Sequence, residues 1–233
     1  MVLANCFLNM ELPLQLSVKR AILQTIVYAD IFDYPLNFSE IERFLISRKK
    51  VALRQLQQTL DLIVKKKLLV KEEDFYFLPG RQKIILTRKK RTQFSQQKLK
   101  IARRITKWLR LIPTFKMAAV TGALAMNNSD ENDDIDILIV TSKNRLWLTR
   151  LFSVLLIELV TQRRRPADRR VKDKICLNMF LDEAHLKIPR KEQDLFTAHE
   201  VCQLKLLWDR DEIYQKFISQ NQWYQKYLAN WKP

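Results

Sequence analysis

Glycine is almost absent from this chain, which has only Gly80 and Gly122 among its 233 residues. The phosphate loop G-x-x-x-x-G-K-[ST] and the dinucleotide turn G-x-G-x-x-G both need closely spaced glycines. Two glycines this far apart can form neither motif. The sequence therefore excludes the two commonest glycine-loop routes to nucleotide binding.

Cysteine and histidine are also scarce. Cys6, Cys176 and Cys202 are widely spaced and form no C-x-x-C pair, so neither a disulfide framework nor a zinc site is indicated. His199-Glu200 is followed by Gln203 where the zinc-peptidase motif H-E-x-x-H requires a second histidine. We therefore expect a protein of a reducing compartment without zinc-peptidase chemistry.

No apolar run is long enough to cross a bilayer. The longest stretch, residues 146–160, contains Arg150 and Glu158. The first basic residue is Lys19, whereas a signal peptide begins with a basic segment. These features predict a soluble, cytoplasmic protein with no membrane partner, and they leave the oligomeric state open.

Positive charge dominates what the sequence does contain. There are 42 Lys and Arg against 25 Asp and Glu, which gives a formal net charge of +17. With 47% hydrophobic residues the chain is also too apolar to be disordered. Such a charge favours an anionic partner, namely nucleic acid, nucleotide or an anionic membrane surface.

The first 90 residues follow the order of a winged helix-turn-helix. Asp33-Tyr34-Pro35 breaks the chain after a first amphipathic helix, and Asn37 with Glu40 has the form of a capping box. Spacing of apolar residues predicts the remaining elements. They are helices over residues 18–27, after Asn37 and over residues 53–63, then strands over residues 68–70 and 75–78. We therefore predict a winged helix-turn-helix domain over residues 1–91.

The rest of the chain predicts a second domain over residues 92–233. A basic helix over residues 92–112 should bury Ile101, Ile105, Trp108 and Ile112, and Pro113 ends it. Its cations should cover the remaining surface; they are Lys98, Lys100, Arg103, Arg104, Lys107 and Arg110. Strands are then expected over residues 117–121, 135–140 and 174–181, and helices over residues 123–126, 145–161 and 192–207, before a final aromatic helix. This mixture predicts an α+β fold.

The most informative segment joins a glycine turn to a cluster of acids. Gly122 lies between an expected strand and a helix start, where the missing Cβ allows a ligand to approach the backbone and the helix N–H groups face a phosphate. Residues 130–136 then contain five acids. Asp134 and Asp136 alternate along a strand, so both side chains should point to one face. Two like charges there are tolerable when a divalent cation lies between them, and oxygen ligands suit Mg²⁺ or Mn²⁺.

Thr121-Gly122-Ala123, ten residues, and Asp134-Ile135-Asp136-Ile137 resemble the signature of the nucleotidyltransferase superfamily. The resemblance covers about residues 116–181. It implies that Asp134 and Asp136 hold the magnesium of a nucleoside triphosphate. It also implies that Gly122 and Ala123 present backbone N–H groups to the phosphates. The implied reaction is attack of an acceptor hydroxyl on the α-phosphorus with release of pyrophosphate.

The sequence departs from that family pattern at two positions. Ala123 stands where the family often has Ser. The family's third carboxylate lies in mid-strand, where the only polar residue is Asn178, and Asp173 and Asp182 at the strand ends are the alternatives. Asn178 is therefore the expected third member of the catalytic set, without a negative charge of its own.

Two other basic features have competing interpretations. Lys49, Lys50 and Arg54 lie at the start of the third helix, which in helix-turn-helix proteins often binds DNA; a purely structural module is the alternative. The arginine run 163–165 is either a solvated face or a clamp for a triphosphate.

We therefore expect a metal-dependent nucleotidyltransferase with an unknown acceptor. The alternatives are a non-catalytic nucleic-acid- or nucleotide-binding protein and a structural module.

Overall fold

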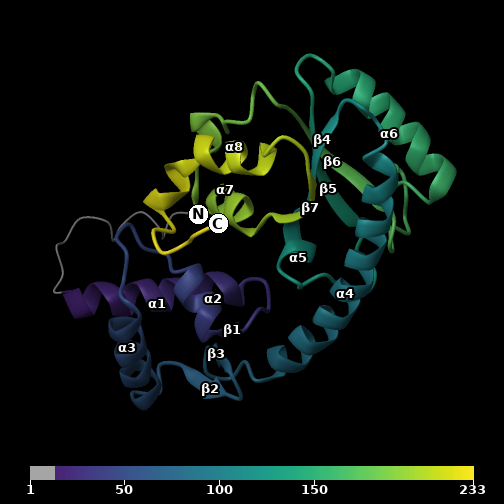
Figure 1. Ribbon diagram of the computed structural model, residues 1–233. Helices are drawn as coiled ribbons and strands as arrows, with labels where there is room; N and C mark the ends of the chain where they lie inside the picture. The colour runs from purple at the N-terminus through teal and green to yellow at the C-terminus, as the bar shows by residue number, and fades with distance from the viewer. Residues whose placement is uncertain (1–13) are drawn as a thin grey trace. The chain divides into compact units, whose positions relative to one another are not determined.

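The computed structural model describes residues 14–233, and its ribbon is shown in Figure 1. Cys6 lies outside the described residues. The chain forms two compact units: unit 1 runs to Ile84 and includes Leu228–Lys232, and unit 2 comprises Ile85–Tyr227 and Pro233. Each unit combines helices with a β-sheet, so the predicted α+β class is confirmed.

Unit 1 is a small helical domain with a three-stranded antiparallel sheet of order β1-β3-β2. Its elements are α1 (Leu14–Asp30), β1 (Leu36–Asn37), α2 (Phe38–Arg43), α3 (Leu53–Lys65), β2 (Val70–Glu72) and β3 (Phe75–Phe77). The three helices and the hairpin were all expected from the sequence. The short strand β1 was not expected, because two residues carry no periodic signal.

The predicted capping box explains why α2 begins where it does. Asn37 Oδ1 accepts a hydrogen bond from the Glu40 backbone N–H at 2.9 Å, and Glu40 Oε2 accepts one from the Asn37 N–H at 2.9 Å. Both donors would otherwise lack partners at a helix start. The cap directs Ile41 and Leu45 into the core, where both are fully buried.

Unit 2 contains a four-stranded mixed sheet of order β6-β5-β4-β7, in which only the β5–β6 pair is parallel. Its helices are α4 (Lys83–Leu109), α5 (Gly122–Ala125), α6 (Leu146–Val160), α7 (Leu195–Gln203) and α8 (Ile213–Gln220). Its strands are β4 (Phe115–Val120), β5 (Ile135–Thr141), β6 (Ile175–Asp182) and β7 (Lys205–Asp209). Two 3₁₀ turns, Arg190–Glu192 and Gln222–Lys226, complete it.

Two predicted boundaries in unit 2 are wrong. Residues 205–207 were expected to extend a helix but form β7, because pairing with the edge of β4 outweighs the local helical pattern. Helix α4 begins at Lys83 rather than residue 92, so the predicted domain boundary at residue 91 falls inside a helix.

The helices cover both faces of this sheet, with α4 and α6 on one side and α7 and α8 on the other (Figure 1). Alternate residues of β5 (Ile135, Ile137 and Ile139) pack toward α4 and α6. The intervening positions, including Asp136, therefore face the side of α7. Trp108 was expected in the core, but it lies at the edge of the apolar stripe of α4 and is 47% exposed.

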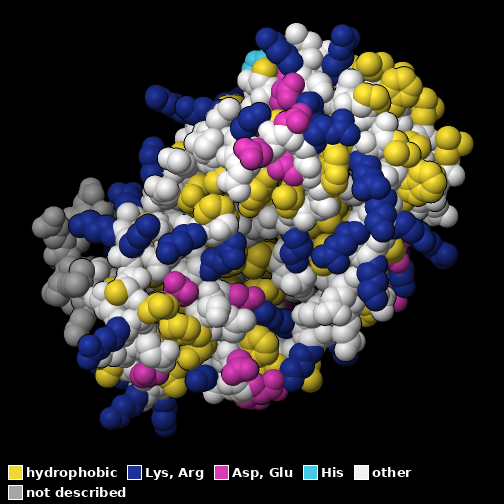
Figure 2. Space-filling view, in the orientation of Figure 1, with side chains coloured by type: hydrophobic (Ala, Val, Ile, Leu, Met, Phe, Trp, Pro, Cys, Tyr) yellow, Lys and Arg dark blue, Asp and Glu magenta, His cyan; other side chains and the backbone are white. Residues whose placement is uncertain are grey.

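The outer face of α6 is apolar and exposed, as Figure 2 shows at the upper right. Its residues recur at helical spacing and include Trp147, Leu151, Leu155 and Leu159. Along α4, Figure 2 shows Lys and Arg side chains instead. In the described part of the chain, no helix combines the length and apolar character needed to cross a membrane.

Candidate functional site

The candidate site is built by the pairing of three neighbouring strands. The Thr121 N–H donates to the Asp136 carbonyl at 3.2 Å, and Asp136 is in register with Cys176 on β6. Residues paired across strands share a face of the sheet, and so do residues two apart along one strand. Thr121, Asp136, Cys176 and Asp134 therefore lie on the same face.

The metal-ligating atoms of this set lie close together. One carboxylate oxygen of Asp134, one of Asp136 and the sulfur of Cys176 all lie within 4.8 Å of one another. Among the described residues this is the only such group of three His, Cys, Asp or Glu side chains. The predicted closeness of Asp134 and Asp136 is confirmed. The donor set, two carboxylates and a thiol, fits a divalent cation.

Burial governs the protonation of this group. It raises the pKa of Asp136; a hydrogen bond from the Cys176 thiol opposes this shift, and the charge of Asp134 adds to it. Burial, and next the hydrogen bond to Asp136, raise the pKa of Cys176 to about 12. Without a cation the thiol is therefore protonated at neutral pH and donates to the carboxylate.

Arg164 supplies the counter-charge. Its Nη1 lies 2.7 Å from Asp134 Oδ2, and the Asp134 side chain is only 12% exposed while that of Arg164 is 44% exposed. A charge-assisted bond of this kind partly offsets the repulsion between the two carboxylates. A cation at the pair must therefore displace or share this contact.

The other acids of residues 130–136 have separate roles. Asp133 Oδ2 accepts from the Asp130 N–H at 2.7 Å and from Ser129 Oγ at 3.2 Å, which shapes the loop. Glu131 pairs with Lys172 at 2.6 Å, both half exposed. Asp130 lies 3.7 Å from Arg91. The structure thus separates Asp134 and Asp136 from their acidic neighbours.

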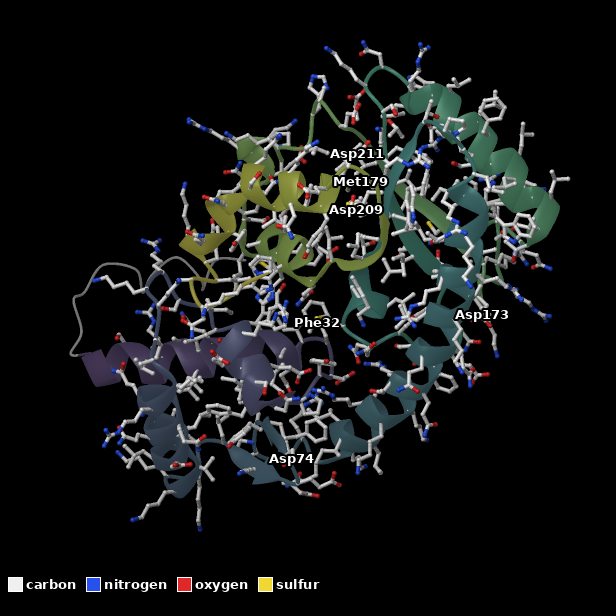
Figure 3. All side chains as sticks on the ribbon, in the orientation of Figure 1. Phe32, Asp74, Asp173, Met179, Asp209 and Asp211 are labelled. Atoms are coloured by element: carbon white, nitrogen blue, oxygen red, sulfur yellow. The ribbon has the colours of Figure 1, made fainter. Side chains whose placement is uncertain are left out.

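Lys98 anchors this loop, although it was expected on the surface. Its side chain is 2% exposed, and Nζ donates to the Glu131 carbonyl at 3.1 Å and to the Asp133 carbonyl at 2.7 Å. Its ion-pair partner is Asp173 Oδ1 at 2.8 Å, and Figure 3 shows Asp173 beside α4. A sequence signal did exist: Lys98 lies four residues before Ala102 and seven before Ile105 on the buried stripe.

The turn at Gly122, between β4 and α5, also brings in a residue that the sequence did not predict. Gly122 has φ +61°, and a Cβ there would lie 3.8 Å from Asp136 Oδ2. Burial raises the pKa of Glu200 on α7; a hydrogen bond from the Gly122 N–H lowers it and Asp136 raises it. Glu200 therefore lies at the same turn. Ala123 next to it is exposed, and its carbonyl accepts from the Asn128 N–H at 2.8 Å.

Asn178 does not pair opposite Asp136. Strand β6 has an irregularity between Cys176 and Met179, which pair with Asp136 and Leu138, so Asn178 has no partner in the register and is exposed. Cys176 takes the place beside Asp136 instead. The bulge arises from one extra residue in β6, which a single sequence does not reveal.

The two alternative carboxylates are engaged elsewhere. Asp173 pairs with Lys98, as described above. Asp182 lies at the far end of β6, where it accepts from the Asn144 N–H at 2.6 Å and from the Ala184 N–H at 2.8 Å. Neither is free to complete the site.

Comparison of the chain with models of protein families, with curated proteins and with solved structures gives no match. The assignment of this site therefore depends on its own residues and their geometry.

Proposed function

We propose that unit 2 is a metal-dependent nucleotidyltransferase that transfers a nucleoside monophosphate from a nucleoside triphosphate to an acceptor hydroxyl. The observation that carries this proposal is the Asp134–Asp136 pair, within 4.8 Å of each other's ligand atoms, at the start of a strand beside the Gly122 turn. Mg²⁺ or Mn²⁺ is the proposed cofactor, held by these two carboxylates. Glu200 brings a further carboxylate to the same turn.

Each residue has a definite task in this reaction. When bound, a divalent ion supplies positive charge to the reacting phosphate. Asp134 and Asp136 orient that charge, and the absent side chain at Gly122 leaves space for a phosphate beside Asp136. Arg164 is exposed enough to leave Asp134 and donate two parallel hydrogen bonds to phosphate oxygens. The acceptor oxygen bonds to the α-phosphorus as the bond from that phosphorus to the α–β bridging oxygen breaks; pyrophosphate leaves, and the proton of the acceptor hydroxyl passes to solvent.

A non-catalytic nucleotide-binding protein is the second candidate, and two contacts favour it. Arg164 already neutralises Asp134, and the Gly122 N–H already has a carboxylate partner in Glu200. Both contacts occupy groups that the transfer reaction would need for its substrate.

Nucleotide should raise the melting temperature of the protein in the presence of Mg²⁺. A triphosphate at 100 times its Kd adds about 2.7 kcal/mol of stability. For a domain of this size, that corresponds to a rise of roughly 5–11 °C. Differential scanning fluorimetry with each of the four triphosphates measures it. A flat response to all four contradicts both candidates.

A labelling experiment distinguishes the transferase from the non-catalytic binding protein. Incubation with α-labelled triphosphate and a cell extract should label an acceptor and release pyrophosphate if unit 2 is an enzyme. A melting shift without label transfer supports the binding protein instead.

For unit 1 we propose a winged helix-turn-helix that binds nucleic acid. Lys49, Lys50 and Arg54 lie just before and in the first turn of α3 and are exposed. Within the described residues, none of the three side chains has an acidic partner. Cations left unpaired at one end of a helix are available to phosphate groups.

Replacement of Lys49, Lys50 and Arg54 by Ala should weaken binding to duplex DNA. If all three contact phosphates, the slope of log affinity against log salt should fall by about 3. Fluorescence anisotropy at several salt concentrations measures this slope. Lys65→Ala with Lys66→Ala, at the other end of α3, is the matched control and should lower the slope less per charge. Equal effects per charge from the two sets of substitutions would show that DNA binding does not depend on a defined surface at the start of α3.

A further inference from the structure

Cys176 is placed by strand pairing rather than by chance proximity. It is in register with Asp136 on the parallel strand β6, and its sulfur lies within 4.8 Å of ligand atoms of both Asp134 and Asp136. The irregularity of β6 begins after Cys176 and moves Asn178 out of register. The fold therefore puts a sulfur atom beside the two carboxylates.

We propose that Cys176 is a ligand of the metal centre and that it makes the centre prefer thiophilic divalent ions over Mg²⁺. The proposal rests on the metal centre of the proposed function but not on transfer chemistry: Mg²⁺ or Mn²⁺ remains the ion of the proposed reaction, and tighter binding of softer ions is an additional property of the same ligands. Mg²⁺ takes oxygen ligands in near-octahedral geometry, whereas a cysteine sulfur favours softer ions such as Zn²⁺ and Cd²⁺. Two carboxylates and one sulfur form a mixed set that suits the softer ions.

Thr121 provides an independent indication that something binds on this face. Its side-chain oxygen is buried and has no hydrogen-bond partner, and the residue is 7% exposed. A buried hydroxyl without a hydrogen-bond partner destabilises the fold. Thr121 is bonded through its N–H to the Asp136 carbonyl and shares the face of Asp136 and Cys176. A cation with its bound water would satisfy this hydroxyl.

The charges are consistent with this ligand set. When the ion binds, the S–H bond of Cys176 breaks, the sulfur bonds to the ion, and the proton leaves to solvent. Two carboxylates and a thiolate then carry three negative charges, which a divalent ion and Arg164 balance. Without Arg164, the same set would be left with a net negative charge.

Cadmium titration of the full chain tests the proposal directly. Cd²⁺ bound to a thiolate gives a charge-transfer absorption in the ultraviolet that carboxylates do not give. We expect the band in the wild-type protein and its loss in Cys176→Ser, with Cd²⁺ affinity lowered by at least about tenfold. Cys202→Ser and Cys6→Ser are the matched controls and should keep the band. Cys176→Asp should reverse the preference, so that Mg²⁺ affinity increases relative to Cd²⁺.

Cadmium NMR of the wild-type protein gives a second readout that needs no variant, since a sulfur ligand moves the resonance away from the all-oxygen range. Cd²⁺ binding without the band and with an all-oxygen resonance overturns the role of Cys176 but leaves the proposed function intact. A sulfur-bound Cd²⁺ in a protein that shows no response to any triphosphate supports this inference and contradicts the proposed function.

Discussion

Asp136→Asn should abolish the metal-dependent response to nucleotide. Changes to residues that only contact a metal ligand already lower metal affinity about 10- to 100-fold. Asp136 is itself a proposed ligand, and it lies beside Asp134, Cys176 and the Gly122 turn. We therefore expect a loss of at least about a hundredfold in Mg²⁺-dependent nucleotide affinity, and no label transfer. Calorimetric titration of nucleotide with and without Mg²⁺ measures the change.

The same variant should melt at a higher temperature without ligands. Burial and the charge of Asp134 raise the pKa of Asp136, so its charged form is less stable in the folded than in the unfolded protein. Removing the charge therefore stabilises the fold at neutral pH. As pH falls below the ordinary range of an aspartate, both states become protonated and the gain should disappear. Melting curves at neutral and acid pH measure this dependence.

Glu131→Gln is the matched control, because Glu131 belongs to the same acidic segment but pairs with Lys172 in solvent. An exposed pair contributes about 0–1 kcal/mol, so stability and nucleotide response should hardly change. Nucleotide binding that survives in Asp136→Asn as well as in Glu131→Gln would remove the basis of the proposed site.

The features that the sequence predicted correctly depend only on residues close together in the chain. The capping box of Asn37 and Glu40 needs only two residues three positions apart. The run of apolar residues in β5 is stable only in the interior of the protein, where β5 lies. The closeness of Asp134 and Asp136 follows from the period of a strand. These features required no knowledge of which segments pair.

The errors concern residues whose position depends on distant segments. Cys176 and Glu200 reach the site through the register of β6 and the packing of α7, neither of which leaves a periodic signal. Lys98 was predicted to lie on the surface because lysine is rarely buried in proteins. Its partner Asp173 lies 75 residues away, so the sequence alone did not show what makes burial of that charge tolerable.

Lys98→Met should be the most destabilising of the substitutions considered. Methionine keeps the apolar stem but removes the donor from the Glu131 carbonyl and from the Asp173 carboxylate. The Asp133 carbonyl keeps only its bond from the Asp173 N–H. Loss of one partner from a buried ion pair costs about 3–5 kcal/mol. Because Asp173 is 40% exposed and stays partly hydrated, we expect the lower end, about 3 kcal/mol. That corresponds to roughly 6–12 °C in Tm.

Urea unfolding followed by tryptophan fluorescence measures this loss, since Trp108, Trp147, Trp208 and Trp223 all belong to unit 2. Lys100→Met is the matched control: it lies two residues along the same helix, is exposed, and should change stability by less than about 0.5 kcal/mol. Lys98→Met with Asp173→Asn should recover part of the loss, because the unpaired carboxylate is removed. Equal stability of Lys98→Met and Lys100→Met would show that α4 does not hold the loop before Asp134, and the rigid placement of that carboxylate would then need another cause.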